Sequence, residues 1–164
     1  MSTRRLLVLP LAFATVLLLA PAALAAGSWR WPVVGPILRG FDPPASPYGS
    51  GHRGIDIATA FGSEVVAAAP GVVSFAGPVG GALFVSVDHG GGLVSSYSWL
   101  SSILVRRGDV VGEGVALALS GGGHPGVSPP HLHFGVRRDG VYVDPLELLA
   151  APSVVGIVRL VPVP

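Results

Sequence analysis

The sequence contains no cysteine and no lysine, and few of its residues are charged. The absence of cysteine excludes disulfide bonds, thiolate metal sites and cysteine nucleophiles. Only 12% of the residues are charged whereas 50% are hydrophobic, which excludes a disordered chain and indicates a buried core. No basic stripe is present, so nucleic acid is not expected as a partner.

The first 25 residues have the features of a secretory signal peptide. Arg4 and Arg5 supply a positive start, Leu6–Ala20 is apolar, and residues 23–25 (Ala-Leu-Ala) form a small-residue cleavage pattern. An uncleaved membrane anchor is the alternative, but two prolines and a run of alanines favour cleavage. We therefore expect a secreted or extracytoplasmic protein without stable membrane insertion. Its charge after cleavage would be −1, from eight arginines and nine acidic residues.

High glycine and proline contents indicate many tight turns between short strands. The 24 glycines and 16 prolines lie between short apolar runs, and residues 82–88 show the period of two of a half-buried strand. We predict an all-β domain over residues 26–150, a single antiparallel β-sheet assembly, followed by a tail at 151–164. The predicted strands are Pro36–Phe41, Ile55–Ala58, Glu64–Ala68, Gly71–Ala76, Ala82–Asp88, Leu93–Trp99, Asp109–Val111, Val115–Ser120, His131–Arg137 and Val141–Val143.

One short C-terminal helix is predicted at the end of this domain. Asp144 provides an acidic N-cap, Pro145 occupies the first helical position, and Glu147 occupies the third, ahead of two leucines. Long helical periodicity is absent from the rest of the domain, so the fold class remains all-β.

Two short segments contain three of the five histidines. They are Gly51-His52-Arg53-Gly54-Ile55-Asp56 and Pro130-His131-Leu132-His133-Phe134-Gly135. Because residues two apart in a strand point to the same face, His131 and His133 should project side by side while Leu132 and Phe134 enter the core. Catalytic zinc uses three protein ligands, commonly histidine nitrogens and a carboxylate oxygen, and leaves a fourth position for water. The two imidazoles, together with another histidine and a carboxylate elsewhere in the chain, supply these ligand types. Each motif alone is weak, and their combination predicts a metal site.

These residues resemble the M23, or lysostaphin-like, metallopeptidases, which include the LytM type. The resemblance covers roughly residues 29–150. Beyond the two histidine motifs, its matching blocks are Trp31–Phe41, Tyr48–Ala58, Pro70–Val73, Val87–Gly90, Arg107–Val111 and Asp144–Leu146.

The resemblance implies both a fold and a chemistry. The fold would be the lysostaphin-like/LytM sheet, and the activity a zinc-dependent cleavage of peptidoglycan cross-links or stem peptides in the cell wall. Zn²⁺ would be held by His52, Asp56 and His133. His131 would lie beside the metal as a catalytic histidine, and peptidoglycan peptides would be the binding partners.

One position departs from the resemblance. Active relatives usually carry Tyr-x-His-Leu on a central strand, whereas this chain has Tyr97-Ser98-Trp99-Leu100. Indole donates hydrogen bonds only and cannot act as a base. A non-catalytic cell-wall binding or amidase-regulating module is therefore an alternative to the peptidase. A cupin-like metal-binding β-barrel is a third possibility, which the spacing of the motifs disfavours.

The remaining candidates have simpler interpretations. His89 is expected to be a turn histidine, and His124 a solvated loop histidine, with a place at the cleft rim as the alternative for His124. Arg53 either binds a substrate carboxylate or pairs with a nearby acid. Trp29 and Trp31 are expected to be packing anchors.

Overall fold

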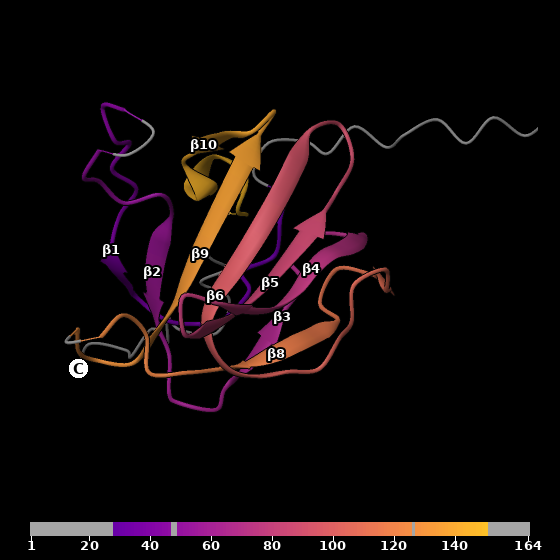
Figure 1. The fold of residues 1–164 in the computed structure, drawn as a ribbon, viewed down its shortest axis with the longest axis horizontal. Helices are drawn as coiled ribbons and strands as arrows, with labels where there is room; N and C mark the ends of the chain where they lie inside the picture. The colour runs from indigo at the N-terminus through magenta and orange to yellow at the C-terminus, as the bar shows by residue number, and fades with distance from the viewer. Residues whose placement is uncertain (1–27, 47–48, 126, 151–164) are drawn as a thin grey trace, which may run out of the picture.

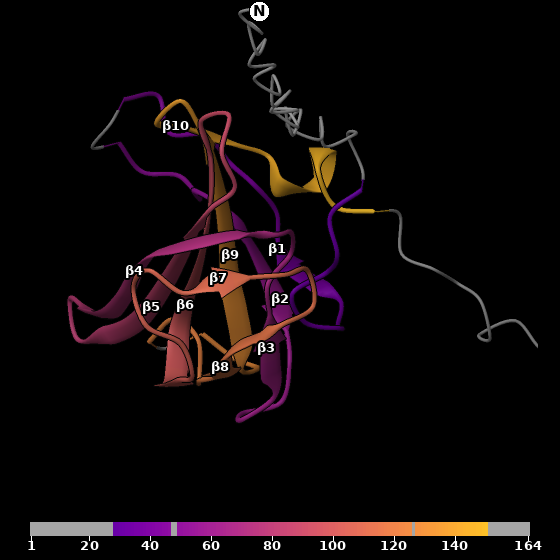
Figure 2. The ribbon, with the colours of Figure 1, turned by 90° about the vertical axis from the view of Figure 1, so that its right-hand side faces the viewer.

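The computed structural model describes residues 28–46, 49–125 and 127–150. The predicted signal peptide and the tail at 151–164 lie outside these residues. Within them the chain forms ten β-strands and one 3-10 turn (Figures 1 and 2). The elements are β1 (Ile37–Arg39), β2 (Ile55–Ala58), β3 (Glu64–Val66), β4 (Gly71–Val79), β5 (Ala82–Asp88), β6 (Leu93–Ile103), β7 (Val110–Val111), β8 (Ala116–Ser120), β9 (His131–Arg138), β10 (Val141–Val143) and η1 (Pro145–Glu147).

All the described strands belong to one antiparallel sheet assembly. Its main path runs β1-β2-β9-β6-β5-β4-β7, while β10 pairs with β9, and β8 pairs with both β3 and β6. Figure 1 shows β9, β6, β5 and β4 side by side across the molecule. The inner faces enclose a single hydrophobic core, to which β3 contributes Val65, β5 contributes Val85 and β9 contributes Phe134. The prediction of an all-β antiparallel fold is therefore confirmed.

The predicted C-terminal helix is a single 3-10 turn, η1. Asp144 caps it as expected, because its Oδ1 accepts a hydrogen bond of 3.0 Å from the backbone N–H of Leu146. Leu148 and Leu149 then enter the core, so the chain leaves the helical path after one turn. None of the helical structure in the described residues is long and apolar enough to cross a membrane.

Strand β6 changes its pairing partner within its own length. Residues 93–98 pair with β9, whereas residues 100–103 pair with β8. Trp99 stands between the two pairings with a φ of 64°. A non-glycine residue in this left-handed region costs about 1–3 kcal/mol, and such positions cluster at functional sites. The sequence pattern predicted a strand ending at Trp99, whereas in the structure β6 continues to Ile103 and its direction changes at Trp99, where the pairing partner changes.

The first described residues are bound to the last. Trp29 N–H donates to Leu148 O at 2.8 Å, and Ala150 N–H donates to Trp29 O at 2.7 Å. The Trp29 side chain is fully buried in the core, and Trp31 Nε1 donates to Ala150 O at 2.8 Å. Both tryptophans therefore anchor the packing, as the sequence analysis predicted.

We expect Trp29→Ala to lower the free energy of unfolding by about 3–5 kcal/mol, because the change removes a large buried aromatic side chain. Val34→Ala, at a side chain that is 94% exposed, should change it by less than about 0.5 kcal/mol. Chemical denaturation of both variants gives the comparison. Equal stability of the two variants would contradict the anchoring role.

His89 is part of a polar network that reaches the buried residues Ser95 and Tyr97. Its Nδ1 donates to Pro70 O at 2.8 Å, its Nε2 lies 2.8 Å from Ser95 Oγ, and Ser95 Oγ lies 3.1 Å from the Tyr97 hydroxyl. The rings of His89 and Trp29 are 4.5 Å apart. Burial lowers the pKa of His89 below 6.5, although the Pro70 carbonyl and the charge of Asp88 oppose this shift. His89 is therefore a structural residue, consistent with the predicted turn histidine.

The lowered pKa of His89 predicts a loss of stability in acid. Below pH 6.5, His89 takes up a proton more readily in the unfolded state than in the folded state. Acid therefore stabilises the unfolded state relative to the folded state. We expect the free energy of unfolding to fall between about pH 7 and pH 5 with chelator present, and to fall less in His89→Gln. Denaturant titrations at the two pH values measure this difference. If the free energy of unfolding falls equally between the two pH values in the wild type and in His89→Gln, a contribution from His89 is ruled out.

Candidate metal centre

The register between β2 and β9 joins the two histidine motifs. Asp56 lies directly opposite His133, and Ala58 lies opposite His131. Side chains of directly opposed residues share one face of a sheet and approach closely. Gly54 permits the close approach, because a Cβ at this position would overlap the backbone of Phe134 in β9. As predicted, Leu132 and Phe134 of β9 are fully buried in the core.

His52 is held just before β2 by its backbone and its ring. Its N–H donates to Asp42 O at 2.7 Å, and the Asp42 N–H donates to His52 O at 3.0 Å. The ring Nδ1 lies 2.7 Å from Gly40 O. A carbonyl oxygen can only accept, so Nδ1 carries a proton, and Nε2 is the ring nitrogen that faces Asp56 and His133.

Donor atoms of the three predicted ligands converge. His52 Nε2 lies 3.0 Å from Asp56 Oδ1 and 3.0 Å from His133 Nδ1, and His133 Nδ1 lies 2.9 Å from Asp56 Oδ1. Zinc binds imidazole nitrogen and carboxylate oxygen at about 2.0–2.2 Å, which separates tetrahedral ligand atoms by roughly 3.3–3.6 Å. The donor set fits zinc in its chemistry, and its spacings of 2.9–3.0 Å are a few tenths of an ångström shorter than in a tetrahedral zinc site.

The environment keeps Asp56 ionised. Burial by itself would raise its pKa, since the residue is only 2% exposed. The hydrogen bond from His133 and the charges of His52, His133 and His124 outweigh burial and lower the pKa of Asp56 to about 2. The carboxylate is therefore available as a ligand throughout the ordinary pH range.

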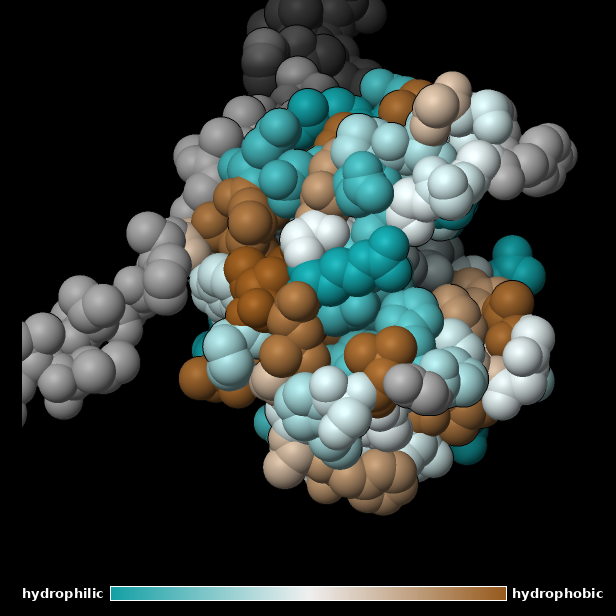
Figure 3. Space-filling model, turned by 90° about the vertical axis from the view of Figure 1, so that its left-hand side faces the viewer, coloured by the Kyte–Doolittle hydropathy of each residue, from teal (hydrophilic) through white to brown (hydrophobic). Residues whose placement is uncertain are grey.

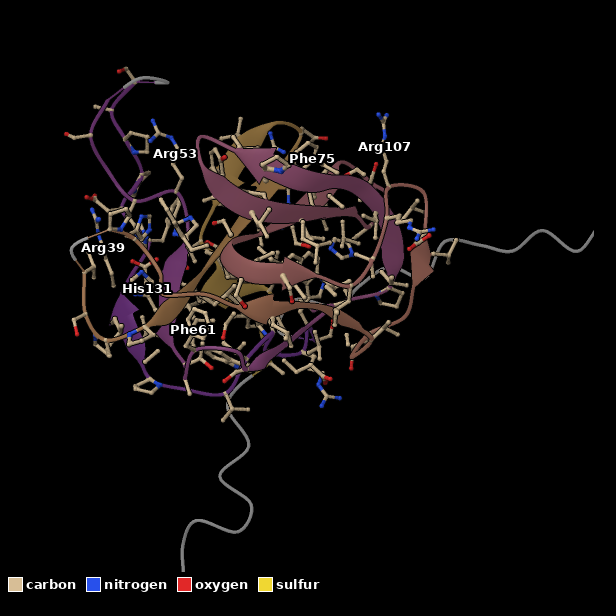
Figure 4. The ribbon with its side chains drawn as sticks, turned by 60° about the horizontal axis from the view of Figure 1, so that its bottom comes forward. Arg39, Arg53, Phe61, Phe75, Arg107 and His131 are labelled. Atoms are coloured by element: carbon tan, nitrogen blue, oxygen red, sulfur yellow. The ribbon has the colours of Figure 1, made fainter. Side chains whose placement is uncertain are left out.

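His131 lies beside this cluster and is fully buried. Its Nδ1 donates to Pro129 O at 3.0 Å, and its Nε2 accepts the backbone N–H of His124 at 3.0 Å. The same Nε2 is 3.9 Å from Asp56 Oδ2. Figure 4 shows the labelled His131 on the side of the molecule that carries β1 and β2. His131 thus lies beside the cluster without belonging to the closest group of donors.

His124 was not among the predicted ligands, yet the structure places it in the cluster. Its Nε2 lies 3.5 Å from Asp56 Oδ1 and 3.5 Å from His133 Nδ1. Burial lowers the pKa of His124, with Asp56 opposing and the neighbouring histidines reinforcing the shift. The sequence favoured a solvated histidine here, because a glycine-rich loop has no periodicity that fixes a side-chain direction.

Trp99 lies against this added histidine. The rings of Trp99 and His124 have centroids 5.0 Å apart and are tilted by 54°. The Trp99 carbonyl accepts the N–H of Gly121 at 2.8 Å, which holds the start of the histidine loop to the bend in β6. Trp99, the residue that departs from the family resemblance, is therefore in direct contact with the cluster.

A cleft adjoins His133. It has a volume of about 220 Å³ and includes His133 in its wall together with residues of β4, β5, β6, β9 and β10: Phe75, Val79, Phe84, Ser86, Ser96, Ser98, Arg137 and Tyr142. Arg137 lies 5.7 Å from the centre of the Tyr142 ring. Figure 3 shows a band of hydrophilic side chains between hydrophobic areas on the side that carries β1 and β2.

Arg53, for which a substrate role was considered, donates to Gly49 O at 3.2 Å.

The order and spacing of these residues match a known family. Residues 50–145 correspond to peptidase family M23. The chain belongs to this family. Membership contradicts the cupin-like alternative and confirms the resemblance on which the ligand assignment was based.

The similar proteins include a lipoprotein and a murein hydrolase activator. The chain is 38% identical over 127 residues to the lipoprotein NlpD/LppB homolog of Pseudomonas aeruginosa, covering 76% of this chain and 41% of the relative. It is 34% identical over 124 residues to the murein hydrolase activator NlpD of Salmonella dublin, covering 74% of this chain and 31% of the relative. The chain thus spans less than half the length of these relatives.

Solved structures agree with the fold. A zinc-containing peptidase from Vibrio cholerae has a TM-score of 0.59 at 29% identity, covering 75% of this chain and 38% of that one. The catalytic domain of lysostaphin from Staphylococcus simulans has a TM-score of 0.56 at 26% identity, covering 68% of this chain and 90% of that one. The lysostaphin-like form of the sheet is therefore confirmed.

If the cluster binds zinc, the metal should stabilise the fold. A ligand present at 1,000 times its Kd adds about 4 kcal/mol to the free energy of unfolding. We expect Zn²⁺ to raise the melting temperature of the wild type and chelator to reverse the effect, whereas His133→Ala should not respond. Val34→Ala is the control that should respond like the wild type. Equal melting temperatures of the wild type with zinc and with chelator would contradict metal binding.

Proposed function

We propose that this protein is a zinc-dependent endopeptidase that cleaves peptide cross-links or stem peptides of peptidoglycan. The observation that supports it is the convergence of His52 Nε2, Asp56 Oδ1 and His133 Nδ1 within 3.0 Å of one another. Membership of peptidase family M23 and the cell-wall role named for the NlpD relative support the substrate class. The protein would then act outside the cytoplasm, at the cell wall.

The roles of the residues follow from their positions. His52, Asp56 and His133 would hold the zinc, which supplies a Lewis acid that polarises the scissile carbonyl. His131 would serve as the catalytic histidine, because its ring lies beside the predicted ligands, with Nε2 3.9 Å from Asp56 Oδ2, and its Nδ1 is fixed as a donor. A positioned imidazole of this kind contributes about 100- to 10,000-fold through proton transfer.

The cleft next to His133 would hold the substrate. Its walls combine aromatic side chains, the serines of β5 and β6, and the cation of Arg137. Serine hydroxyls can bind peptide groups, and a guanidinium pairs well with a carboxylate. Short peptides with free carboxylates, such as the stem peptides of peptidoglycan, match this lining.

Trp99 favours a second function, a non-catalytic activator or wall-binding module. Its indole occupies the position where active relatives usually have a histidine, and it packs on His124 at 5.0 Å. The relative from Salmonella dublin is itself named as a murein hydrolase activator. In this case the metal centre would preserve the fold, and the cleft would bind the wall or a partner enzyme without cutting.

Digestion of peptidoglycan fragments separates the two functions. The purified protein with Zn²⁺ should release peptides, chelator should stop the release, and added Zn²⁺ should restore it. His131→Ala should retain the metal yet lose at least about 100-fold in rate. Chromatography of the released peptides and metal analysis of the same samples measure both effects.

The control and the contrary outcome use the same assay. Val34→Ala should digest like the wild type, since its side chain is 94% exposed. A wild type that binds zinc and releases nothing, but accelerates an added cell-wall amidase, would establish the activator function. Loss of zinc in His131→Ala would show that His131 is a ligand instead of a catalytic residue.

A further inference from the structure

We propose that His124 is a fourth protein ligand of the metal, so that the chain closes its own metal centre. The proposal rests on the proposed function, because it assumes that zinc binds at His52, Asp56 and His133. The side chains of these three residues and of His124 bring one donor atom each into a group in which all four lie within 4.8 Å of one another.

Two of the three distances from His124 to the other donors fit a tetrahedral shell, and the third, to His52, lies within 4.8 Å. His124 Nε2 is 3.5 Å from both Asp56 Oδ1 and His133 Nδ1, within the roughly 3.3–3.6 Å expected between ligands of one tetrahedral zinc. The rings of His124 and His133 are arranged edge to face, with centroids 5.2 Å apart and an angle of 83° between their planes. His124 approaches the group from the side of the β8–β9 loop, whereas the other three donors come from β9, β2 and the segment before β2.

Three contacts hold the ring of His124 in this place. It lies against Trp99 at 5.0 Å and stacks on His131 at 5.4 Å, with an angle of 29° between the imidazole planes. Its own backbone N–H is bound to His131 Nε2 at 3.0 Å. A histidine on a solvated loop would not be fixed by two aromatic neighbours and a buried acceptor.

The residue before His124 allows this contact. Gly123 has a φ of +83°, and a Cβ at this position would overlap the imidazole ring of His131. Glycine is the residue that adopts such a conformation at no steric cost. The backbone of the loop can therefore lie directly on His131.

Four protein ligands change what the centre can do. Zinc sites with four protein ligands are structural, whereas catalytic sites have three and keep one position open. With His124 in place, the open position is occupied, and the His131 Nε2 lone pair is already used by the His124 amide. The centre would then hold its metal in a closed state, and a substrate carbonyl would reach the metal only after His124 leaves.

Zinc affinity tests the proposal directly. Competition with a chromophoric chelator would compare the wild type with His124→Phe, which keeps a ring against Trp99 but has no donor nitrogen, and with His124→Ala. Mutation of a residue that hydrogen-bonds to a metal ligand typically lowers metal affinity about 10- to 100-fold. Loss of a direct ligand should therefore weaken Zn²⁺ binding by at least about 100-fold. Val127→Ala, in the same loop with a side chain that is 49% exposed, should bind like the wild type.

A small competing ligand reports on the open position. Acetohydroxamate, added to the Co²⁺-loaded proteins and followed by visible absorption, should bind His124→Phe and His124→Ala readily. If the wild-type centre is closed in nine molecules of ten, its apparent affinity for acetohydroxamate should be about tenfold lower. Circular dichroism of the metal-free proteins verifies that the variants are folded.

The possible outcomes distinguish this proposal from the proposed function. Weaker zinc binding and stronger acetohydroxamate binding in both His124 variants would support a fourth ligand. Unchanged affinities for both would overturn it and leave the three-ligand peptidase centre intact. A wild type that binds no zinc at all would overturn the proposed function as well.

Discussion

The site depends on the antiparallel pairing of β2 with β9 in a single register. This pairing sets Asp56 opposite His133 and brings the H-x-x-x-D and H-x-H motifs, which are about eighty residues apart in sequence, to one place. A slip of one residue would turn every side chain of β2 to the other face of the sheet. The buried Ile55 and Ile57 on either side of Asp56 prevent such a slip, because they would then leave the core.

The cluster combines burial with charge. Asp56 is only 2% exposed and keeps its negative charge, with a pKa of about 2, because imidazole groups surround it. A buried charge is costly unless it is paired or coordinates a metal. The same strand, β9, supplies Leu132 and Phe134 to the core and His131 and His133 to the cluster. The stability of the fold and the chemistry of the site are thus carried by opposite faces of one strand.

The bend in β6 connects the sheet to the added histidine. Trp99 adopts a φ of 64°, accepts a hydrogen bond from Gly121 and packs against His124. Backbone strain of this kind persists only where the surroundings enforce it. The substitution of the usual histidine by tryptophan, taken alone, suggests a loss of activity. In the structure the indole also provides a surface for His124, and the two residues form one local unit.

The sequence by itself determined the strands, their alternation and the two histidine motifs. These features are local: the period of two, the turn residues and the short spacing within H-x-H decide which side chains share a face, so the all-β fold and a metal site at the two motifs could be predicted. The choice of His52, Asp56 and His133 as its ligands came from the resemblance to family M23. The tertiary structure alone decided the position of His124, the bend at Trp99 and the 3-10 form of the last turn. A glycine-rich loop has many accessible conformations, and the one it adopts is selected by contacts with residues such as Trp99 and His131, which only the folded chain brings near it.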